Sequence, residues 1–487
     1  MFQDRTGVLN RIFWVIIISL VVFTCGLQIH HLLAYWMKGR MAIKLHYDGY
    51  NVSDFPFPAI TFCSDLQLQH LDKRKIGDDL FNKHFEDTVQ LLCSPYETNY
   101  SGSIRFINSK VWQHVLSNHG VMCDQHINRV LWLRDKIELP CKYFQPMITS
   151  YGLCYSLNMI PFHLLFNNDY FHMLSFLDHP LAQIIRKKNL NTWNPEVGFK
   201  PDLTPFDTPW RVTGDSVNNR VSLHFKFKRN PGVNCPITGK GFVLIMHNPA
   251  DAPISLQPTA YISGNRRVAV SSIISIWPTA PTIHAWSPKS RNCYFQHEKP
   301  LRYFKVYTEN NCDIECRINN TIKRCGCSAY YHPRDYDIPI CGSASYACMI
   351  NTPGYSIFNE KFPDSIEDEC DCMPACTEVR YEFKVVGMFK NWTNSDENDE
   401  MESSRLSLHF EKEAVISIEK TALISFNELL SNTGGILGLF LGCSIISIFE
   451  IIYFFVIRLL VDRWNSKKHQ RNNNDFSISH KITHPTQ

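Results

Sequence analysis

The chain has 487 residues, a formal net charge of +3 at neutral pH and 18 cysteines. This length allows about two to four domains, and the nearly balanced charge gives no reason to expect a nucleic-acid partner. No Ser/His/Asp arrangement, phosphate-binding loop or metal motif stands out in the sequence. We therefore expect neither an enzyme nor a metal site, and no cofactor.

An apolar segment, residues 12–35, lies close to the start of the chain and contains no Asp, Glu, Lys or Arg. It is long enough to cross a bilayer. A cleaved signal peptide is the alternative, but the apolar run is too long for such a peptide and no small-x-small cleavage site follows it. We predict a transmembrane helix at 12–35, preceded by a cytoplasmic segment at 1–11.

A second apolar stretch covers residues 425–460, and Leu429–Phe449 contains no charged side chain. Small residues recur in it at a spacing that places them in one stripe along a helix: Ser431, Gly435, Gly438 and Gly442. Such a stripe serves either helix packing or a pore. Glu450 follows within the apolar run. A carboxylate at this depth indicates a bundle interior or a water-filled path, unless it reaches the membrane surface from near a helix end.

The cysteines are concentrated between the two apolar stretches. Cys25 and Cys443 lie within the stretches, and the other 16 lie between them. An even number of cysteines in one block predicts a disulfide framework in an oxidising compartment. A zinc site at Cys325–Cys327 or Cys370–Cys372 is the alternative, although each pair is separated by one residue instead of the usual two or more.

Two membrane spans would place both termini on the same side. Basic residues follow the second stretch and favour the cytoplasm: Arg458, Arg463, Lys467, Lys468 and Arg471. Residues 36–424 are then extracellular, and residues 461–487 form a polar, disordered cytoplasmic tail. Four glycosylation sequons agree with this topology, at Asn51, Asn99, Asn319 and Asn391.

The block between the spans has mixed secondary-structure signals. Alternating or continuous apolar patterns predict strands at 221–228, 241–247 and 406–410. Helical or mixed signals occur at 70–85, 301–310 and 311–320, and proline-rich loops are expected at 194–209, 249–258 and 278–288. These signals predict a β-sheet core with peripheral helices.

Several motifs together resemble one protein family. The stretch Gly434–Ser444, with Glu450 after it, is similar to the second transmembrane segment of the degenerin/epithelial sodium channel superfamily. The resemblance continues in four segments outside the membrane: Phe57–Cys63, Tyr151–Asn158, Gly241–Pro253 and the cysteine-rich block Cys293–Cys376. Tyr331–Arg334 and Ile340–Gly342 look most like the arthropod pickpocket branch, and the similarity runs from Arg11 to Arg463.

The resemblance implies both a fold and a function. The fold is membrane α+β and trimeric, with two transmembrane helices flanking a large disulfide-rich extracellular domain. That domain has a β-sheet core, peripheral helices and a thumb at about 293–376, as in acid-sensing channels. The function is that of one subunit of a sodium-permeable, amiloride-sensitive plasma-membrane channel gated from outside. Its partners would be related subunits in a homo- or heterotrimer, and sodium would be the permeant ion.

Individual site residues follow from the same resemblance. It implies a selectivity filter at Gly442, Cys443 and Ser444, and a pore lined by Ser431, Asn432, Gly435, Gly438 and Glu450. A gating contact of Trp286 with Tyr35 or Trp36 is also implied, and a simple buried anchor at Trp286 is the alternative. An acidic cluster is either part of a proton- or cation-sensing pocket or a solvated face: Asp364, Glu367, Asp368 and Glu369.

The resemblance also implies cysteine pairs that the sequence alone leaves open. They are Cys63–Cys154, Cys293–Cys376, Cys312–Cys372, Cys316–Cys370, Cys325–Cys348 and Cys327–Cys341. For the four cysteines left over, we favour Cys123–Cys141 with Cys93–Cys235.

The sequence departs from the family pattern at three points. No His-Gly pair precedes the first apolar segment, so either the N-terminus is truncated or gating is impaired, and we expect little or no current from this chain alone. Asn432 replaces a common Asp, and Cys443 replaces Ala or Ser in the filter. A non-conducting cysteine-rich receptor or adhesion protein and an ATP-gated type of trimeric channel are the rival interpretations. The stimulus stays open.

Overall fold

The computed structural model describes most of the chain and forms two compact units. One, here called the helical unit, comprises Met1–Ala42, Thr282–Trp286 and Thr421–Gln487; the other, the sheet unit, comprises Ile43–Pro281 and Ser287–Lys420. The described residues are 3–39, 41–65, 79–93, 104–167, 193–200, 207, 209–212, 220–228, 241–352, 370–390, 401–442, 444–461 and 463–464.

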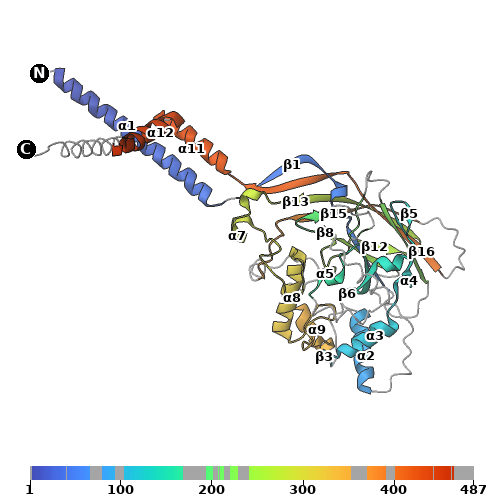
Figure 1. Ribbon diagram of the computed structural model, residues 1–487. Helices are drawn as coiled ribbons and strands as arrows, with labels where there is room; N and C mark the ends of the chain where they lie inside the picture. The colour runs from blue at the N-terminus through green and yellow to red at the C-terminus, as the bar shows by residue number, and fades with distance from the viewer. Residues whose placement is uncertain are drawn as a thin grey trace, which may run out of the picture. The chain divides into compact units, whose positions relative to one another are not determined.

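The helical unit contains one long helix and one interrupted helix (Figure 1). Helix α1 covers Gln3–Met37; α11 covers Phe426–Leu441, α12 covers Ile445–Ile452, and a π-helical turn, η6, covers Tyr453–Ile457. Among the described residues, Asn10–Met37 is the one helix that is long and apolar enough to cross a membrane. Its large apolar side chains point outward, since Phe13, Trp14 and Phe23 are each more than half exposed. A surface of this kind is stable in lipid.

The larger sheet of the sheet unit has eight strands. Seven of them follow the order β1-β17-β13-β16-β10-β4-β5, and the eighth, β15, lies off this path and pairs with β13. The strands are β1 Met41–Asn51, β4 Ile127–Trp132, β5 Asp135–Lys136, β10 Arg220–Lys228, β13 Arg266–Trp277, β15 Glu378–Lys390, β16 Met401–Phe410 and β17 Ala414–Ala422. Because side chains alternate along a strand, β10 buries Val221, Leu223 and Phe225 and turns its intervening residues to the other face.

The second sheet has five strands and lies at the centre of the core. Its order is β12-β11-β2-β7-β6, with β2 Ala59–Ser64, β6 Phe144–Thr149, β7 Gly152–Leu157, β11 Gly241–His247 and β12 Ala260–Ser263. Every residue of β2 and β7 is buried. Phe62 of β2 contacts the rings of Phe242 in this sheet and Phe225 in the larger sheet, at centroid distances of 5.8 and 5.3 Å. These aromatic contacts join the two sheets into one core.

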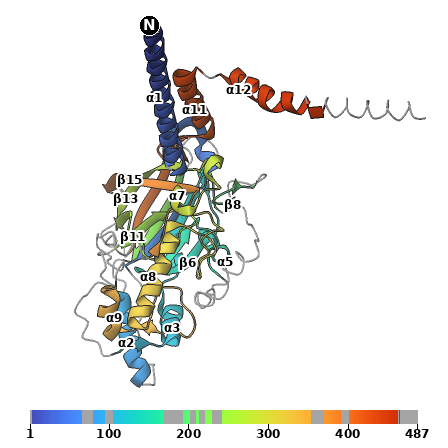
Figure 2. The same ribbon diagram turned by 90° about the vertical axis from the view of Figure 1, so that its left-hand side faces the viewer.

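The helices of the sheet unit lie at its periphery. In both ribbon views, α2, α3 and α9 gather at one end, and α8 runs from there along the sheets (Figure 1, Figure 2). The helices are α2 Asp79–Cys93, α3 Ser109–His119, α4 Cys123–His126, α5 Phe162–Leu165, α7 Pro288–Arg291, α8 Glu309–Cys325 and α9 Ser343–Ile350. Short pairings add β3 Phe106–Ile107 with β14 Ile340–Cys341 and β8 Trp193–Asn194 with β9 Gly198–Phe199. Three short 3-10 turns are η1 Val52–Asp54, η2 Pro140–Tyr143 and η5 Pro281–Ile283.

Helix α8 has recognisable signals at both ends. The Thr308 hydroxyl accepts a hydrogen bond from the Asn311 N–H at 3.1 Å and so caps the first turn. Lys323 and Arg324 lie in the last turn, and Gly326 ends the helix in the left-handed region with φ of 69°. These residues fix the length of the helix that contributes a cysteine to three disulfides, at Cys312, Cys316 and Cys325.

The expected sheet core and peripheral helices are present in the described residues. The predicted strands at 221–228, 241–247 and 406–410 lie in β10, β11 and β16, and 311–320 lies within α8. The segment 301–310, which has helical or mixed signals, is helical only at its end, because α8 begins at Glu309 and Phe304 forms a bridge with Phe166. The proline-rich segment 194–209 contains the β8–β9 pairing. Residues 70–78 lie outside the described residues.

Candidate pore and gating sites

Five disulfides between Cys293 and Cys376 form a ladder, and three of them have one cysteine in α8. The structure contains the six pairs that the family resemblance implies, together with Cys123–Cys141. Both members of each C-x-C pair, 325 with 327 and 370 with 372, are in disulfides, so the zinc interpretation is wrong. The pairing of Cys93 with Cys235 lies outside the described residues.

The first rung of the ladder is reinforced by a buried arginine. Arg291 is 1% exposed, pairs with Glu298, and donates from Nε to Sγ of Cys376 at 3.3 Å. Burial alone would raise the pKa of Glu298. Hydrogen bonds from Arg291 and the Phe295 N–H, together with the charge of Arg291, outweigh this effect, so the pKa lies below its usual value. Because the ion pair and the Cys293–Cys376 rung meet at Cys376, the start of β15 is held at the base of the thumb.

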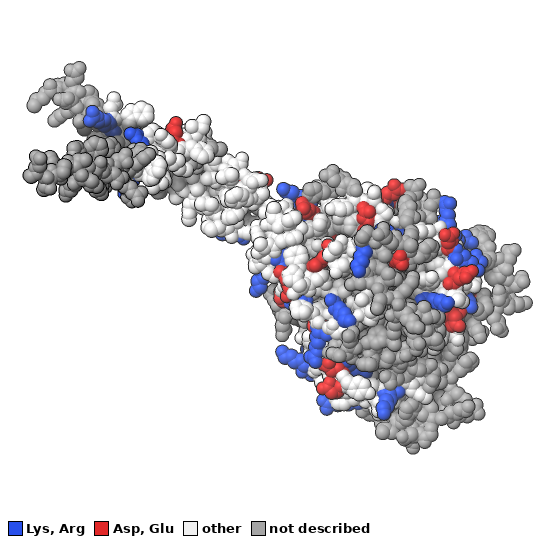
Figure 3. Space-filling model, in the orientation of Figure 1, with Lys and Arg blue, Asp and Glu red and all other residues white. Residues whose placement is uncertain are grey.

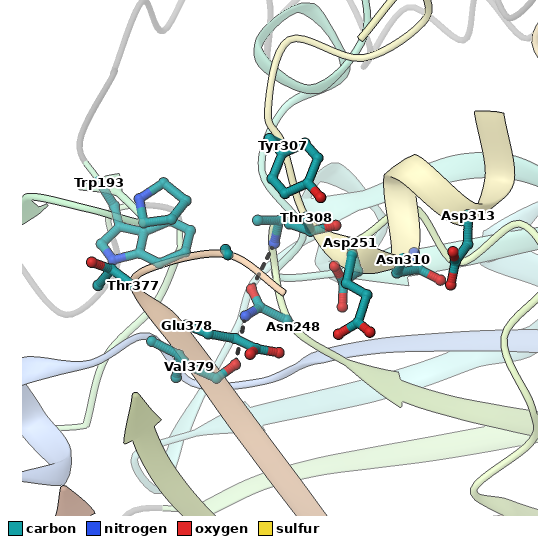
Figure 4. Close-up of a pocket in the computed structure, with 14 residues that line it drawn as sticks. Trp193, Asn248, Asp251, Tyr307, Thr308, Asn310, Asp313, Thr377, Glu378 and Val379 are labelled. Carbon is teal, nitrogen blue, oxygen red and sulfur yellow. Dashed lines mark hydrogen bonds between the residues drawn. The ribbon is translucent and has the colours of Figure 1, made fainter. Parts of the chain in front are cut away.

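A pocket of about 270 Å³ opens between the N-terminus of α8, the loop after β11 and the start of β15 (Figure 4). Four carboxylates line it: Asp251, Glu309, Asp313 and Glu378. Asn248 orders the loop, since its amide donates to the Val379 carbonyl at 2.8 Å and its carbonyl accepts from the Ala250 N–H at 2.9 Å. The pocket therefore concentrates acidic side chains at the contact between thumb helix and sheet.

The carboxylates of this pocket have perturbed acidity. Burial raises the pKa of Asp251 to about 7, and the charges of Glu378 and Glu309 raise it as well. Burial followed by repulsion from Glu378 and Asp313 raises the pKa of Glu309 to about 7. Arg380 offsets part of this repulsion, because its guanidinium lies 2.7 Å from Glu378 and 4.0 Å from Glu309. Raised carboxylate pKa values of this kind mark a candidate site for proton uptake near neutral pH.

Sequence reasoning missed this pocket. It proposed the cluster at residues 364–369, which lies outside the described residues. The four carboxylates found here come from three separate segments, so no local sequence pattern predicts that they lie together. The one available signal was Asp251, which lies in the family-like segment Gly241–Pro253.

The second apolar stretch is broken at the expected filter. Helix α11 ends at Leu441, Gly442 adopts a left-handed conformation with φ of 61°, and its N–H donates to the Gly438 carbonyl at 3.0 Å. Ser444 then caps α12, since its hydroxyl accepts from the Ser447 N–H at 3.3 Å. Figure 2 shows α11 and α12 running in different directions on either side of this break. Cys443 lies outside the described residues.

The small-residue stripe faces away from α1. Helix α1 packs beside α11. The buried or half-buried residues of α11 lie on one side of the helix: Leu429, Thr433, Ile436, Leu437 and Phe440. The stripe residues Ser431, Gly435, Gly438 and Gly442 are all exposed, and so is Asn432. A Cβ built on Gly435 or Gly442 would touch nothing within 4 Å. Within the described part of the chain, the stripe therefore does not serve packing.

The remaining predicted positions are placed as follows. Glu450 is exposed on α12, three residues before the π-helical turn begins at Tyr453. Trp286 is half-buried and belongs to the same compact unit as Tyr35 and Trp36. Of the sequons, Asn51 and Asn319 are exposed, and Asn99 and Asn391 lie outside the described residues.

Comparison with known proteins identifies the family. The family described as ASC, amiloride-sensitive sodium channel, matches residues 2–454. Pickpocket protein 28 of Drosophila melanogaster is 25% identical over 96% of this chain and 78% of that protein. Sodium channel protein Nach of Drosophila ananassae is 22% identical over 94% and 83%, and the bile acid-sensitive ion channel of Homo sapiens is 21% identical over 93% and 82%.

The chain belongs to the amiloride-sensitive sodium channel family. It is an ion channel protein of the degenerin type, with the membrane channel fold of that family and a β-rich, disulfide-bonded extracellular domain.

Proposed function

We propose that the chain is one subunit of a trimeric, sodium-permeable, amiloride-sensitive channel of the plasma membrane. Helix α1 and the α11–α12 stretch are its two spans, both termini are cytoplasmic, and the sheet unit is extracellular. The observation that carries this proposal is the break at Gly442–Ser444 in an otherwise apolar helical stretch.

The break supplies polar groups where the membrane offers none. The last carbonyls of a helix and the first N–H groups of the next have no partner within their helices. Backbone of this kind is tolerated at membrane depth only where it is buried in protein or lines a water-filled cavity. Three copies would surround the axis with carbonyl and Ser444 hydroxyl oxygens, which replace part of the hydration shell of a cation. Glu450 would add negative charge beyond the filter and enrich cations there.

The two faces of α11 support the same arrangement. The face with Leu429, Thr433 and Ile436 lies toward α1, so the stripe of small residues stays available for the axis. Small side chains allow three helices to approach closely without blocking the path. In Figure 3, the described atoms of the helical unit are almost all uncharged, in contrast to the mixed charges of the sheet unit. This surface suits lipid and neighbouring subunits.

The carboxylate pocket gives the extracellular domain a means to respond to protons. Glu378 begins β15, and Lys420, whose charge also acts on Glu309, lies in β17. Lys420 exchanges backbone hydrogen bonds with the strand-end segment at Pro278 and Ala280, at 2.9 and 2.8 Å. The chain then continues from Lys420 into α11 and from Ala280 toward Trp286. A change of charge in the pocket therefore acts on strands that lead directly into the helical unit.

Whole-cell recording tests the proposed function. The chain is expressed alone and together with a related pickpocket-type subunit, and current is measured before and after sodium is replaced by a large organic cation. The proposal expects an inward current that disappears with sodium replacement and is blocked by amiloride. Surface expression without any sodium-dependent current in either combination would contradict it and favour a non-conducting receptor.

A further inference from the structure

The outer face of the eight-stranded sheet differs sharply from its core face. The core face of its central strands is apolar and buried, with Val221, Leu223 and Phe225 in β10, Val268 and Val270 in β13, and Leu406 and Leu408 in β16. On the outer face the same strands carry arginine, lysine, histidine and serine. Strand alternation places residues 220, 222, 224 and 226 of β10 together on this face.

Four of these outer residues form one straight row across four neighbouring strands. The strand register pairs His224 of β10 with Arg129 of β4 on one side and with Arg405 of β16 on the other. Arg405 is paired in turn with Arg267 of β13. Directly opposed residues share a face and lie about 4.5–5.5 Å apart, so this basic row places one arginine on each side of His224 and a third arginine one strand beyond Arg405.

Part of this row has no counter-charge within the described chain. Of the ion pairs found among the described residues, none involves Arg129 or Arg405. Arg405 donates to the Ser222 hydroxyl at 3.3 Å, while its buried Nε and the buried Nε2 of His224 have no hydrogen-bond partner. Like charges that face each other across strands are destabilising, and buried polar atoms without partners cost further free energy. Arrangements that break local rules in this way are typical of binding sites.

The electrostatics agree with such crowding. Burial lowers the pKa of His224 to about 4, and Arg405, Arg129 and Arg267 lower it as well. Burial also lowers the pKa of Arg405, with contributions from Arg220 and Arg267. The positive charges therefore act on one another at short range, and a bound anion would relieve this repulsion.

We propose that the basic row binds a doubly charged oxyanion, sulfate or phosphate, above His224. Arg129 and Arg405 flank His224 from the two neighbouring strands, about 10 Å apart, which lets both long side chains converge on one ion. The planar guanidinium forks match the oxygens of sulfate or phosphate. The Nε2–H of neutral His224 would donate to the same ion from the sheet surface. The ion can be free or an ester on a larger molecule, because both present the same oxygens.

Calorimetric titration of the purified full-length chain tests this site with three probes: inorganic sulfate, inorganic phosphate and a sulfated heparin disaccharide. We expect saturable binding of at least one probe at low ionic strength. Arg405→Gln should weaken it about tenfold or more, because a charge-assisted hydrogen bond is lost. Tighter binding of the disaccharide than of inorganic sulfate would identify an ester as the natural source, and the reverse order a free ion.

A matched control separates the site from general charge. Arg266 is the exposed neighbour of Arg267 on the opposite face of β13, and Arg266→Gln removes the same charge. It should leave the affinity unchanged. In the absence of anion, Arg405→Gln should leave the melting temperature unchanged or raised, because it removes repulsion. Failure of all three probes to bind the unsubstituted chain, or equal loss in Arg266→Gln and Arg405→Gln, would overturn the proposal.

Discussion

The helical unit and the sheet unit differ in how their parts are held together. All seven disulfides of the described residues lie in the sheet unit, whereas Cys25, the free cysteine among them, lies in α1 of the helical unit. The sheet unit also has the aromatic core around Phe62 and the buried Arg291–Glu298 pair. The helical unit has an exposed stripe of small residues and a break at Gly442. The comparison indicates a sheet unit that is crosslinked throughout and a helical unit whose described residues carry no crosslink.

The largest expected effect concerns the crosslinks. Replacement of Cys312 and Cys372 by Ala opens a rung that spans 60 residues of sequence. The adjacent Cys316–Cys370 rung still closes most of that loop, so the free energy of unfolding should fall by about 2 kcal/mol. Thermal unfolding of the purified chain measures this loss. Cys25→Ala is the control in the other unit, with an expected loss of at most about 1 kcal/mol. Equal losses in both variants would remove the distinction between the units.

A bulky residue on the stripe tests the mobile part. Ser431 is exposed at the start of the stripe, and in the closed pore a large side chain there would meet its symmetry copies. Ser431→Phe should shift the pore toward the open state by about 1.4 kcal/mol, a tenfold change in the ratio of open to closed channels. Leu430→Phe, at the adjacent exposed position off the stripe, should leave the sustained current unchanged. A closed Ser431→Phe channel at normal surface levels would argue against the stripe as the pore face.

The smallest effect concerns the carboxylate pocket. The pKa of Asp251 is raised from 3.8 to about 7 in the folded chain, so folding favours its protonated form. The native state then holds more protons than the unfolded state between about pH 4 and 7, and stability falls as pH rises through this window. Asp251→Asn removes this pH-dependent loss. Between pH 4 and pH 8, the variant should therefore lose about 1 kcal/mol less stability than the unsubstituted chain. Thermal unfolding at the two pH values measures it.

An exposed aspartate provides the control for that measurement. Asp135 in β5 is exposed, so Asp135→Asn should leave the pH dependence of the unfolding temperature unchanged. If Asp251→Asn follows the pH profile of the unsubstituted chain as closely as Asp135→Asn does, then the Asp251 carboxylate is ionised in the folded state at neutral pH and the pocket has no role as a proton sensor.

Local patterns were sufficient for some features of the molecule. Alternation of apolar residues placed β10 and β11, and the spacing of small residues defined the stripe on α11. The disulfide pairs followed from similarity to a family, because many pairings of the same cysteines are compatible with the sequence. The interrupted helix at Gly442 likewise followed from that similarity, since glycine alone does not end a helix.

Features that depend on long-range geometry were not accessible in this way. The pocket combines Asp251, Glu309 and Glu378, which only the packing of α8 against the strand ends brings together. The basic row requires the register of four strands from distant parts of the chain, and a shift of one residue would turn Arg405 into the core. The helical or mixed signals at 301–310 did not show where α8 begins, because the apolar residues before Glu309 pack by tertiary contacts, such as the bridge of Phe304 with Phe166.

The most direct test of the account is the reversal potential of Ser444 variants under bi-ionic conditions, with sodium on one side of the membrane and potassium on the other. A tenfold change in the permeability ratio corresponds to a shift of about 59 mV. We expect Ser444→Ala to shift the reversal potential by an amount of this order, and Thr433→Ala, on the α1-facing side of α11, to leave it unchanged. Ser444 variants that conduct with the reversal potential of the unsubstituted channel would contradict the assignment of the ion-selective site to the break between α11 and α12.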